Sequence, residues 1–445
     1  MDEIITTKVV EAQLPWYSYF KARSSWCDLI SNSRGDQVVK KAKRVFAILG
    51  LYQHLPLERL NDKPYSNILC SRRGKECKEF KSFSIWKNIE VDYFLERQWF
   101  VLAPIFKTRG EHIPVEEKAP LPFYDVEEVS HSLTSTVYKG RLPTAYLMPT
   151  KNEPQIAIKC YALEKDFKRE KDNLVKIQDL KHPHLIQHIA TVQRGDLFYA
   201  ILYWADGGNL SDFWERYPNA FQTRCPELFT WCLQQMLGLV EALFALHKVN
   251  CRHGDLKPEN ILCFLKSDDP KIPHSQYGTL VIADVGVSRV HRLATELRHD
   301  PTDTKATTPS YEAPEAETDR HKPRRRRYDM WSVGCIFMEF VIWWLDGYDA
   351  IGAFRELRKM NDNSFNQKAP YYQCTGNTAI IHPAVSTRLN ELKNDTRCAK
   401  DPGLADLIKL IADDLIVIDP EKRPTAGKLS EKFKEIFRNV KKYPT

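Results

Sequence analysis

Near Pro226 the chain changes from short runs typical of β-strands to long segments with helical periodicity, and this change limits the folds open to it. The β-type runs are FYDVEEVS, STVYKG, QIAIKCYA and LFYAILYW, with a helical segment, DFKREKDNLVKIQDL, between the third and fourth. The later helical segments include PELFTWCLQQMLGLVEALFALH, GLADLIKLIADDLIV and TAGKLSEKFKEIFRNV. We therefore predict an α+β fold of two lobes: a small antiparallel β lobe with one helix, and a larger helical lobe. Such folds place a ligand between their lobes.

The segment Met330–Leu345 is apolar enough to suggest a membrane span, but it is shorter than the roughly 20 residues that a spanning helix needs. It also carries Glu339, so we expect a buried helix and no membrane partner. The eleven cysteines, an odd number without a C-x-x-C pair, are typical of reduced thiols. With no secretory pattern at the start, we expect an intracellular protein in the cytoplasm, with the nucleus as an alternative.

The passage TRGEHIPVEEKAPLPF is rich in proline and charge and is a candidate domain boundary. We predict a mostly helical N-terminal extension of unassigned role over residues 1–117 and a two-lobed domain over 118–440. Its small lobe would cover about 118–204 and its large lobe about 205–440. The net charge of +7 over 445 residues is mild, so it permits a phosphate-bearing partner without requiring one.

The strongest chemical signal is CRHGDLKPENILCF, which places a carboxylate, a cation and an amide close together. Phosphoryl transfer requires alignment and charge neutralisation more than covalent chemistry from the protein. Asp255 is suited to orient a hydroxyl and take its proton, Lys257 to balance phosphoryl charge, and Asn260 to hold magnesium. Asp284 follows the apolar run LVIA and precedes Val285 and Gly286, a position suited to a second metal ligand.

A further cation, Lys159, lies in the β-type run IAIKCY on the same face as Ala157, where it could grip phosphate oxygens. Together with APE (Ala313–Glu315) downstream, these motifs stand in a specific order. From about Phe123 to Val440 the chain resembles a eukaryotic protein kinase of the serine/threonine class. IAIK resembles its lysine strand, HGDLKPEN its catalytic loop, and DVG its magnesium motif.

The resemblance implies transfer of the γ-phosphate of ATP to Ser or Thr hydroxyls of protein substrates, with Mg²⁺. It implies that Thr308 contacts the catalytic loop and that Arg423, in DPEKRPTA, pairs with Glu315. It also implies an adenine pocket lined by core and hinge residues, namely Val137, Ala157, Leu202, Tyr203, Ala205 and Leu262. The resemblance leaves two candidates for the residue that pairs with Lys159. If FKRE begins the regulatory helix of the family, the partner is Glu170, whereas counting back along the sequence from KHPHLI by the family's usual spacing leads to Asn173. We favour Glu170, because a buried cation without an acidic partner is costly.

Three features depart from the family pattern. The glycines of the phosphate-covering loop are replaced by Ser130, Ser132 and Ser135. If these residues must adopt left-handed angles, each costs about 1–2 kcal/mol, although their hydroxyls can donate to phosphate oxygens. Gly254 stands where an arginine usually grips an activation-segment phosphate, and Val285 replaces an aromatic residue.

Two other functions stay open. The first is a pseudokinase of the same fold that binds nucleotide weakly or not at all and acts as a scaffold. The second is a nucleic-acid-associated protein, suggested by KKAKR and by KPRRRR within His321–Tyr328. A solvated basic loop is the simpler interpretation of the second motif, and we do not expect a nucleic-acid partner.

Overall fold

The computed structural model describes the residues 88–89, 92, 103–107, 110–132, 134–148, 152–221, 225–266, 272, 275–284, 310–319, 325–359, 369–376, 378–399 and 401–442. The chain divides into two compact units. The smaller comprises Met1–Val126, Gly140–Pro154 and Val192–Leu197, and the larger comprises Glu127–Lys139, Gln155–Thr191 and Phe198–Thr445. All described residues of the candidate site belong to the larger unit.

The main sheet has six strands in the order β2-β7-β8-β6-β4-β3. In chain order they are β2 (Glu111–Val115), β3 (Tyr124–His131), β4 (Ser135–Arg141), β6 (Gln155–Tyr161), β7 (His188–Arg194) and β8 (Leu197–Tyr203). β6 and β8 are antiparallel, with Ala157 opposite Leu202 and Lys159 opposite Ala200. Since residues directly opposite one another share a face of the sheet, this register places the lysine on the same side as two of the predicted adenine-pocket residues.

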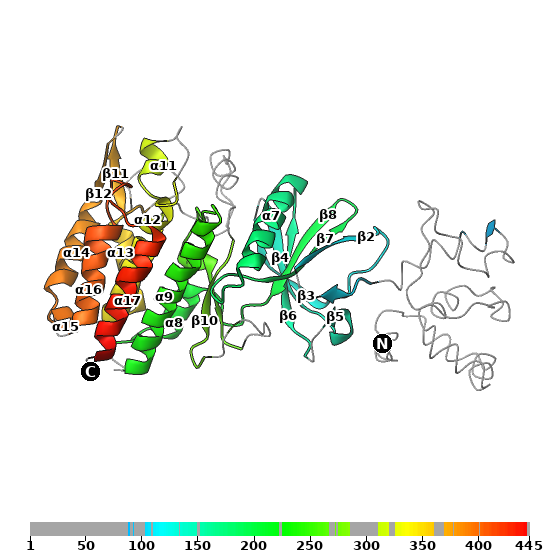
Figure 1. The fold of residues 1–445 in the computed structure, drawn as a ribbon, viewed down its shortest axis with the longest axis horizontal. Helices are drawn as coiled ribbons and strands as arrows, with labels where there is room; N and C mark the ends of the chain where they lie inside the picture. Colours follow the sequence, from blue (N-terminus) through cyan, green and yellow to red (C-terminus); the bar gives the residue numbers. More distant parts are fainter. Residues whose placement is uncertain are drawn as a thin grey trace. The chain divides into compact units, whose positions relative to one another are not determined.

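One helix, α7 (Glu164–Leu180), accompanies these strands, where a single helix was predicted (Figure 1). Its buried side chains are Phe167, Glu170, Leu174 and Ile177, a spacing of three and four residues that forms one face of a helix. The helix ends at Lys181, whose φ of 49° is left-handed. Its buried face therefore contains one acid among three apolar residues.

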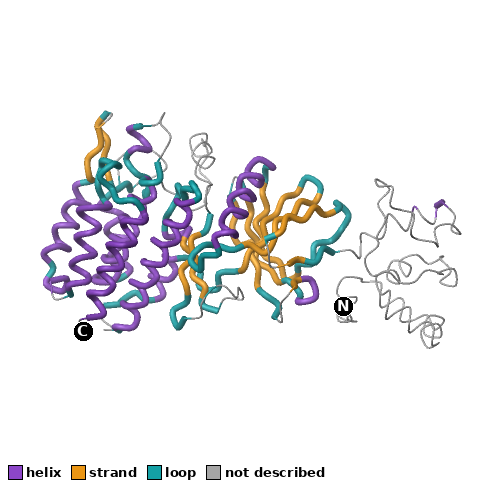
Figure 2. The backbone as a smooth tube through the Cα atoms, viewed as in Figure 1, coloured by secondary structure: helices purple, strands orange, loops and turns teal. Residues whose placement is uncertain are grey.

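The chain from Leu210 onward is mainly helical (Figure 2). Its α-helices are α8 (Leu210–Arg216), α9 (Pro226–Lys248), α11 (Glu315–Thr318), α12 (Tyr328–Asp346), α13 (Tyr348–Leu357), α14 (Pro383–Asn394), α15 (Thr396–Ala399), α16 (Pro402–Leu410) and α17 (Ala426–Lys442). α9 and α17 pack against each other, and Gly427 permits close approach, since an added Cβ would lie 2.9 Å from Phe244 Cε2. The predicted division into a sheet-containing part and a helical part is confirmed.

Two helices here are apolar along most of their length. Every residue of α12 from Tyr328 to Leu345 is buried, as expected for a core helix. α9 is long and apolar enough to cross a membrane by length and composition, but it packs on α17 and on the strand β10 (Thr279–Ile282). Its apolar surface is thereby used within the fold.

Short paired strands complete the described fold. β9 (Ile261–Phe264) and β10 (Thr279–Ile282) form an antiparallel hairpin, and the 3₁₀ turn Pro258–Asn260 leads directly into β9. β11 (Tyr372–Thr375) pairs with β12 (Thr378–Ile381), and in the smaller unit β1 (Phe106–Lys107) pairs with β5 (Leu147–Met148). The β9–β10 hairpin matters most for function, because Asn260 precedes one strand and Asp284 follows the other.

The predicted N-terminal extension, residues 1–117, lies mostly outside the described residues. Its described part from residue 103 onward contains strands β1 and β2 where a mostly helical segment was predicted. β2 begins directly after Gly110, whose φ of 69° makes a turn. Side chains of EHIPV then alternate between half-buried and exposed, which is the two-residue period of a strand.

Candidate active site

The loop His253–Asn260 is held in place by a buried carboxylate from α12. Asp329 is 0% exposed and accepts hydrogen bonds from the backbone N–H of His253 (3.0 Å) and of Gly254 (2.9 Å). It also accepts one from His247 Nε2 at 2.8 Å. Burial, the largest single influence, raises the pKa of Asp329, but the hydrogen bonds from His247 and from the backbone N–H of Gly254 act together with nearby positive charge, and the pKa is lowered overall. Gly254 has a φ of 80°, so glycine suits the backbone here.

The ring of His253 links this loop to the end of β10. Its Nδ1 accepts a hydrogen bond from the backbone N–H of Asp255 at 3.2 Å. Its Nε2 lies 2.8 Å from the carbonyl oxygen of Ala283. Because one ring nitrogen accepts, the network assigns the proton to the other, so Nε2–H donates to Ala283. The imidazole thus positions Asp255 and the residue before Asp284 at once.

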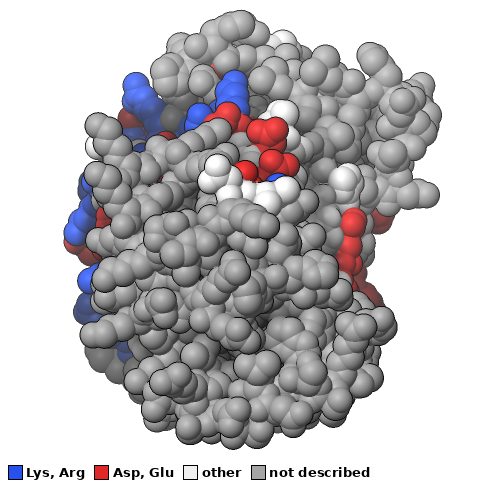
Figure 3. Space-filling model, turned by 90° about the vertical axis from the view of Figure 1, so that its right-hand side faces the viewer, with Lys and Arg blue, Asp and Glu red and all other residues white. Residues whose placement is uncertain are grey.

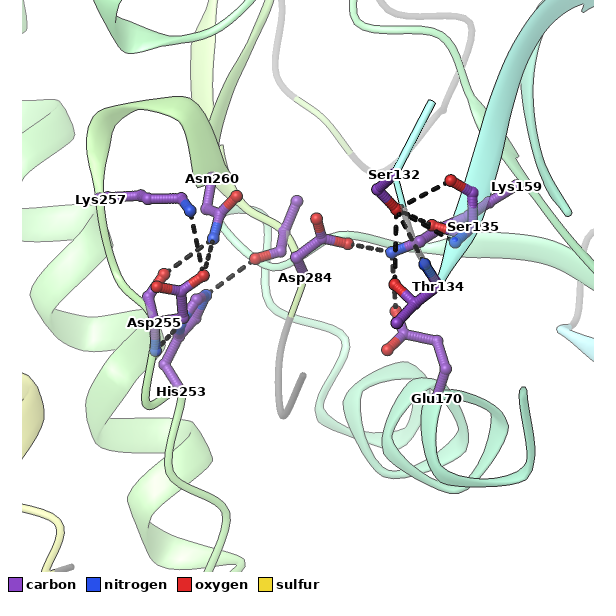
Figure 4. A network of polar contacts seen from close by, with 11 residues as sticks. Ser132, Thr134, Ser135, Lys159, Glu170, His253, Asp255, Lys257, Asn260 and Asp284 are labelled. Atoms are coloured by element: carbon purple, nitrogen blue, oxygen red, sulfur yellow. Dashed lines mark hydrogen bonds and ion pairs between the residues drawn. The ribbon is translucent and has the colours of Figure 1, made fainter. Parts of the chain in front are cut away.

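Asp255, Lys257 and Asn260 contact one another within the loop (Figure 4). Asn260 Nδ2 donates to the carbonyl oxygen of Asp255 at 2.8 Å and to its Oδ2 at 3.2 Å. Lys257 Nζ lies 3.2 Å from the same Oδ2. The loop therefore brings together a carboxylate, a cation and an amide, the groups that its sequence contained.

Asp284 reaches the site from the end of β10, where the backbone N–H of Ala283 donates to the carbonyl of Asn260 at 2.9 Å. Its φ of 57° is left-handed, a strained geometry for a residue other than glycine that often accompanies function. Asp284 Oδ1 lies 2.5 Å from Lys159 Nζ, across 125 positions of sequence. Its side chain is 45% exposed, so a bound ligand can reach it.

Lys159 thus lies between two acids, Asp284 and Glu170. Of the two predicted alternatives, Glu170 and Asn173, Glu170 is the one near its ammonium group. The Nζ to Glu170 Oε1 distance is 4.0 Å, so Asp284 is the closer partner. Burial alone lowers the pKa of Lys159, but the charges of Asp284 and Glu170 raise it above its usual value. Burial raises the pKa of Glu170 to about 7, opposed by the charge of Lys159. Burial also raises the pKa of Asp284, but the charge and hydrogen bond of Lys159, together with further positive charge that includes Lys257, lower it overall.

The predicted adenine-pocket residues share a partial exposure. Side chains that neighbour them on β6, β8 and β9 are fully buried, whereas these are half-buried: Val137, Ala157, Leu202, Ala205 and Leu262. Leu262 forms an isolated bridge with Asn209. Tyr203 is buried and ends β8. Of these residues, Ala157 and Leu202 share a sheet face with Lys159, and partly open apolar side chains there are suited to a flat aromatic ligand.

The three serines of the phosphate-covering loop have different environments. Ser130 is exposed, Ser132 is partly buried, and Ser135 is buried at the start of β4. Ser132 Oγ donates to the carbonyl of Ser135 at 2.8 Å and accepts from the backbone N–H of Ser135 at 3.1 Å. It also accepts from the N–H of Thr134 at 3.4 Å. Here the hydroxyl of Ser132 stabilises its own loop, where it was predicted to donate to phosphate.

The backbone strain expected at these serines is not found. Among the described residues, positive φ occurs outside glycine at Asp125, Lys181, Asn250 and Asp284. The expectation that serines would be forced into left-handed angles is therefore wrong for this conformation, because side-chain hydrogen bonds shape the loop instead.

Other predicted residues fall into two groups. Thr308, Val285 and Gly286 lie outside the described residues. The pair Arg423–Glu315 is confirmed and bidentate, with Nη1–Oε1 and Nη2–Oε2 distances of 2.8 and 2.9 Å. This arginine is buried and ties the start of α11 to the turn before α17.

Sequence reasoning assigned no chemical role to His253, His247 or Asp329. A signal existed in the run YDMWSVGC, where an acid stands in the first turn of a mostly apolar helix. A buried carboxylate needs partners, and here those partners are the backbone of the catalytic loop. Which loop it would contact depends on the packing of α12 and was not encoded locally.

The residues present fit a magnesium ion. The amide nitrogen of Asn260 donates to Asp255, which turns its amide oxygen to the opposite side, and Asp284 supplies a carboxylate. Oxygen donors suit Mg²⁺, which proteins usually hold through one or two carboxylates together with phosphate oxygens. Among the described residues no group of three or more His, Cys, Asp or Glu could hold a metal, so phosphate oxygens would complete the coordination.

Comparison with known proteins identifies the family. The family model described as the protein kinase domain matches residues 134–433, which is more than half of the chain, and the chain therefore belongs to the protein kinase family.

Individual relatives are more distant. The chain is 29% identical over 277 residues to a Dictyostelium discoideum protein named "Probable myosin light chain kinase", covering 61% of this chain and 58% of that one. It is 25% identical over 283 residues to calcium/calmodulin-dependent protein kinase type 1 of Caenorhabditis briggsae, covering 62% and 70%. It is 32% identical over 215 residues to the mouse serine/threonine-protein kinase ULK3, covering 46% and 40%. The chain thus spans little more than half of the first relative and less than half of the last.

Proposed function

We propose that this protein is an ATP-dependent serine/threonine protein kinase that uses Mg²⁺. The observation that carries this proposal is that three stretches of sequence, which contribute Lys159, the pair Asp255 and Asn260, and Asp284, converge around one loop and the end of one strand (Figure 4). Relatives named as serine/threonine kinases support the choice of hydroxyl substrate.

In this proposal Asp255 accepts the proton of the substrate hydroxyl as oxygen attacks the γ-phosphorus, and the bond to the β-phosphate oxygen breaks. Asn260 donates to the carboxylate of Asp255, and the ring of His253 accepts a hydrogen bond from its backbone N–H. Lys257, 3.2 Å from Asp255, stabilises charge on the transferring phosphoryl group. A bound magnesium ion supplies charge neutralisation for the phosphates, and Asn260 and Asp284 would hold it.

Lys159 binds phosphate oxygens of ATP in the same proposal. In the structure it contacts Asp284 at 2.5 Å and Glu170 at 4.0 Å. To bind a phosphate, Lys159 would have to release its contact with Asp284 while Glu170 keeps the lysine side chain oriented. The release would leave the Asp284 carboxylate available to the metal. The half-buried apolar side chains near it would bind the adenine.

The pseudokinase alternative has one supporting observation. Ser132 uses its hydroxyl and two loop amides within its own loop, which removes donors that a covering loop can offer to phosphates. This favours weaker nucleotide binding. Against it, the base, both metal-binding side chains and the phosphate-binding lysine are all present.

The test is transfer of radiolabelled phosphate from ATP with Mg²⁺ to a generic basic protein, followed by phosphoamino-acid analysis. We expect phosphoserine or phosphothreonine, and Asp255→Asn should lower the rate by about 10²–10⁴-fold. Glu259→Gln is the matched control, because Glu259 is an exposed acid of the same loop, and should leave the rate near wild type. If the wild type transfers no phosphate although ATP raises its melting temperature, the pseudokinase function replaces this one.

We further propose a cytoplasmic protein whose partners are ATP and a protein substrate, without a membrane or nucleic-acid partner. Fractionation of cells with an antibody against the chain tests the location. Enrichment in the nucleus would support a role of KPRRRR as an address.

A further inference from the structure

The basic run KPRRRR contributes to a cavity in the helical region, whose lining contains none of the proposed catalytic, metal-binding or ATP-binding residues. The cavity has a volume of about 590 Å³ and lies where the end of α9, the start of α12 and the start of α17 meet. Arg325, Arg326 and Arg327 line it, together with Lys248 and Arg252. Lys322 and Arg324 of the same run lie outside the described residues.

Charge in this cavity is strongly one-sided. Five basic side chains line it against one acid, Glu421, which leaves an excess of four positive charges. On the face shown in Figure 3, by contrast, the described side chains include both basic and acidic groups. A concave site lined by charges of one sign concentrates ligands of the opposite sign, so the cavity is suited to an anion.

The arginines are held in place by the surrounding fold. Arg325 and Arg327 both contact the carboxylate of Glu421, and Arg327 Nη1 also donates to the carbonyl of Glu421 at 3.0 Å. Arg326 donates to the carbonyl of His247 near the end of α9. Two guanidinium groups thus share one carboxylate and are aligned side by side, which lowers the entropy lost when they bind a ligand.

The remaining cations lie on aromatic rings. Lys248 Nζ is 4.3 Å from the ring centre of Phe244, and the guanidinium of Arg252 is 5.4 Å from that of Tyr328. Phe244, Met330 and Ala426 add apolar surface to the lining. The cavity therefore combines cations with apolar contacts, and its ligand should combine an anion with an apolar group.

We propose that this cavity binds a peptide segment that carries a phosphoserine or phosphothreonine next to an apolar side chain. A phosphate of about −1.5 to −2 charges matches the charge excess better than a single carboxylate, and guanidinium groups bind phosphate through paired hydrogen bonds. The apolar residue of the peptide would contact the apolar lining. A polyphosphorylated small molecule or a nucleic-acid backbone offers phosphates but no such aliphatic group.

The test measures fluorescence polarisation of a labelled peptide with one phosphothreonine preceded by leucine, added to the full-length protein without ATP. Binding is therefore measured independently of catalysis. We expect the double variant Lys248→Glu, Arg325→Glu to weaken binding by at least about tenfold, the loss expected for one charge-assisted hydrogen bond. Both residues are exposed, Arg325 with 72% of its side chain, so the fold should tolerate the change.

The matched control is Lys393→Glu, Lys409→Glu, which makes the same change in net charge at exposed positions on α14 and α16. It should change binding by less than about twofold, since distant surface charges are largely screened. Glu421→Gln removes the competing negative charge while keeping an acceptor for the arginines, and should strengthen binding severalfold.

Three results would overturn the proposal. One is equal binding of the unphosphorylated peptide. A second is equal weakening by the cavity variant and its control. The third is that replacing leucine by alanine in the peptide has no effect while an inositol polyphosphate or a single-stranded oligonucleotide competes fully, which would assign the cavity to phosphates of another source.

Discussion

The catalytic loop and the phosphate-covering loop both depart from the family pattern by a change at glycine, but they are held in place differently. The catalytic loop, His253–Asn260, gains Gly254 and is fastened by Asp329, which is fully buried and lies 69 or more positions away in sequence. The covering loop, Ser130–Ser135, loses its glycines and is fastened by Ser132 to residues two and three positions away. The first loop depends on tertiary packing and the second on local hydrogen bonds.

This difference indicates how much stability a substitution in each loop should cost. A buried hydrogen-bond network is expensive to disrupt, because groups left unpaired keep their desolvation cost. A local turn formed by one hydroxyl at a partly exposed position can be lost at little cost. The catalytic loop should thus behave as part of the core, and the covering loop as an adjustable element.

The largest effect is expected for Asp329→Ala, which leaves two buried backbone N–H groups and His247 without their acceptor. We expect a loss of about 3–5 kcal/mol in the free energy of unfolding, measured by urea denaturation. Asp329→Asn keeps one side-chain acceptor oxygen and should lose less. If the alanine variant unfolds at the same urea concentration as wild type, the loop is not fastened in this way.

We expect Glu170, which lies near Lys159, to make the stability of the protein depend on pH. Its pKa of about 7 in the folded protein exceeds the value of about 4.3 in an unfolded chain. Between these values the unfolded state releases this proton more readily, so the contribution of Glu170 to stability falls as pH rises from about 4.5 to 7.

The measurement is the free energy of unfolding of wild type minus that of Glu170→Gln across this range. At 1.36 kcal/mol for each pKa unit, the difference should change by up to about 4 kcal/mol. A difference that is constant with pH would show that Glu170 stays ionised, as in a tight pair with Lys159. Above pH 7 the curve should be flat.

Gly254→Ala tests whether the backbone conformation of the catalytic loop requires glycine at this position. Since the φ of Gly254 is 80°, an added Cβ should cost about 1–2 kcal/mol, measured as a lower melting temperature. Gly352→Ala in α13 is the control, because an added Cβ meets nothing within 4 Å, and should be neutral or stabilise the helix by about 0.5–1 kcal/mol. Equal effects of the two would mean that Gly254 is not conformationally required.

The smallest effect on stability is expected for Ser132→Gly, about 0.5–1.5 kcal/mol for its hydrogen bonds. Because it releases the N–H groups of Thr134 and Ser135, the same change should tighten ATP binding by up to about tenfold, measured by calorimetry. Ser130→Gly, at an exposed position, should leave affinity near wild type. Weaker ATP binding by Ser132→Gly would mean that the hydroxyl contacts phosphate after all.

Much of the fold could be predicted from periodicity. The two-residue period of QIAIKCY and the three- and four-residue spacing in α7 led to β6 and α7 near their observed bounds, and α9, α12 and α17 were found from their apolar patterns. The short strand β2 was missed because five residues give a weak pattern, and because a charge- and proline-rich passage suggested a boundary instead.

Part of the candidate site could also be predicted from the sequence, and part of it could not. Asp255, Lys257 and Asn260 stand close together in the sequence, so their proximity followed from the loop itself. That Lys159 contacts Asp284 more closely than Glu170 could not be predicted, because the distance depends on how β6, α7 and the end of β10 pack. The inward hydrogen bonds of Ser132 likewise depend on the local conformation of the loop.

The amino-acid sequence alone determined which chemical groups this protein possesses and the kinds of element that carry them, because residue type and short-range periodicity act over a few neighbouring positions. Tertiary structure decided which groups meet: the buried Asp329 under the catalytic loop, the lysine between two acids, and the three arginines around one cavity. The contacts of Asp329 and the Lys159–Asp284 pair join residues 75 to 125 positions apart, and the cavity arises where three helices converge. Only the packing of the core brings such groups together.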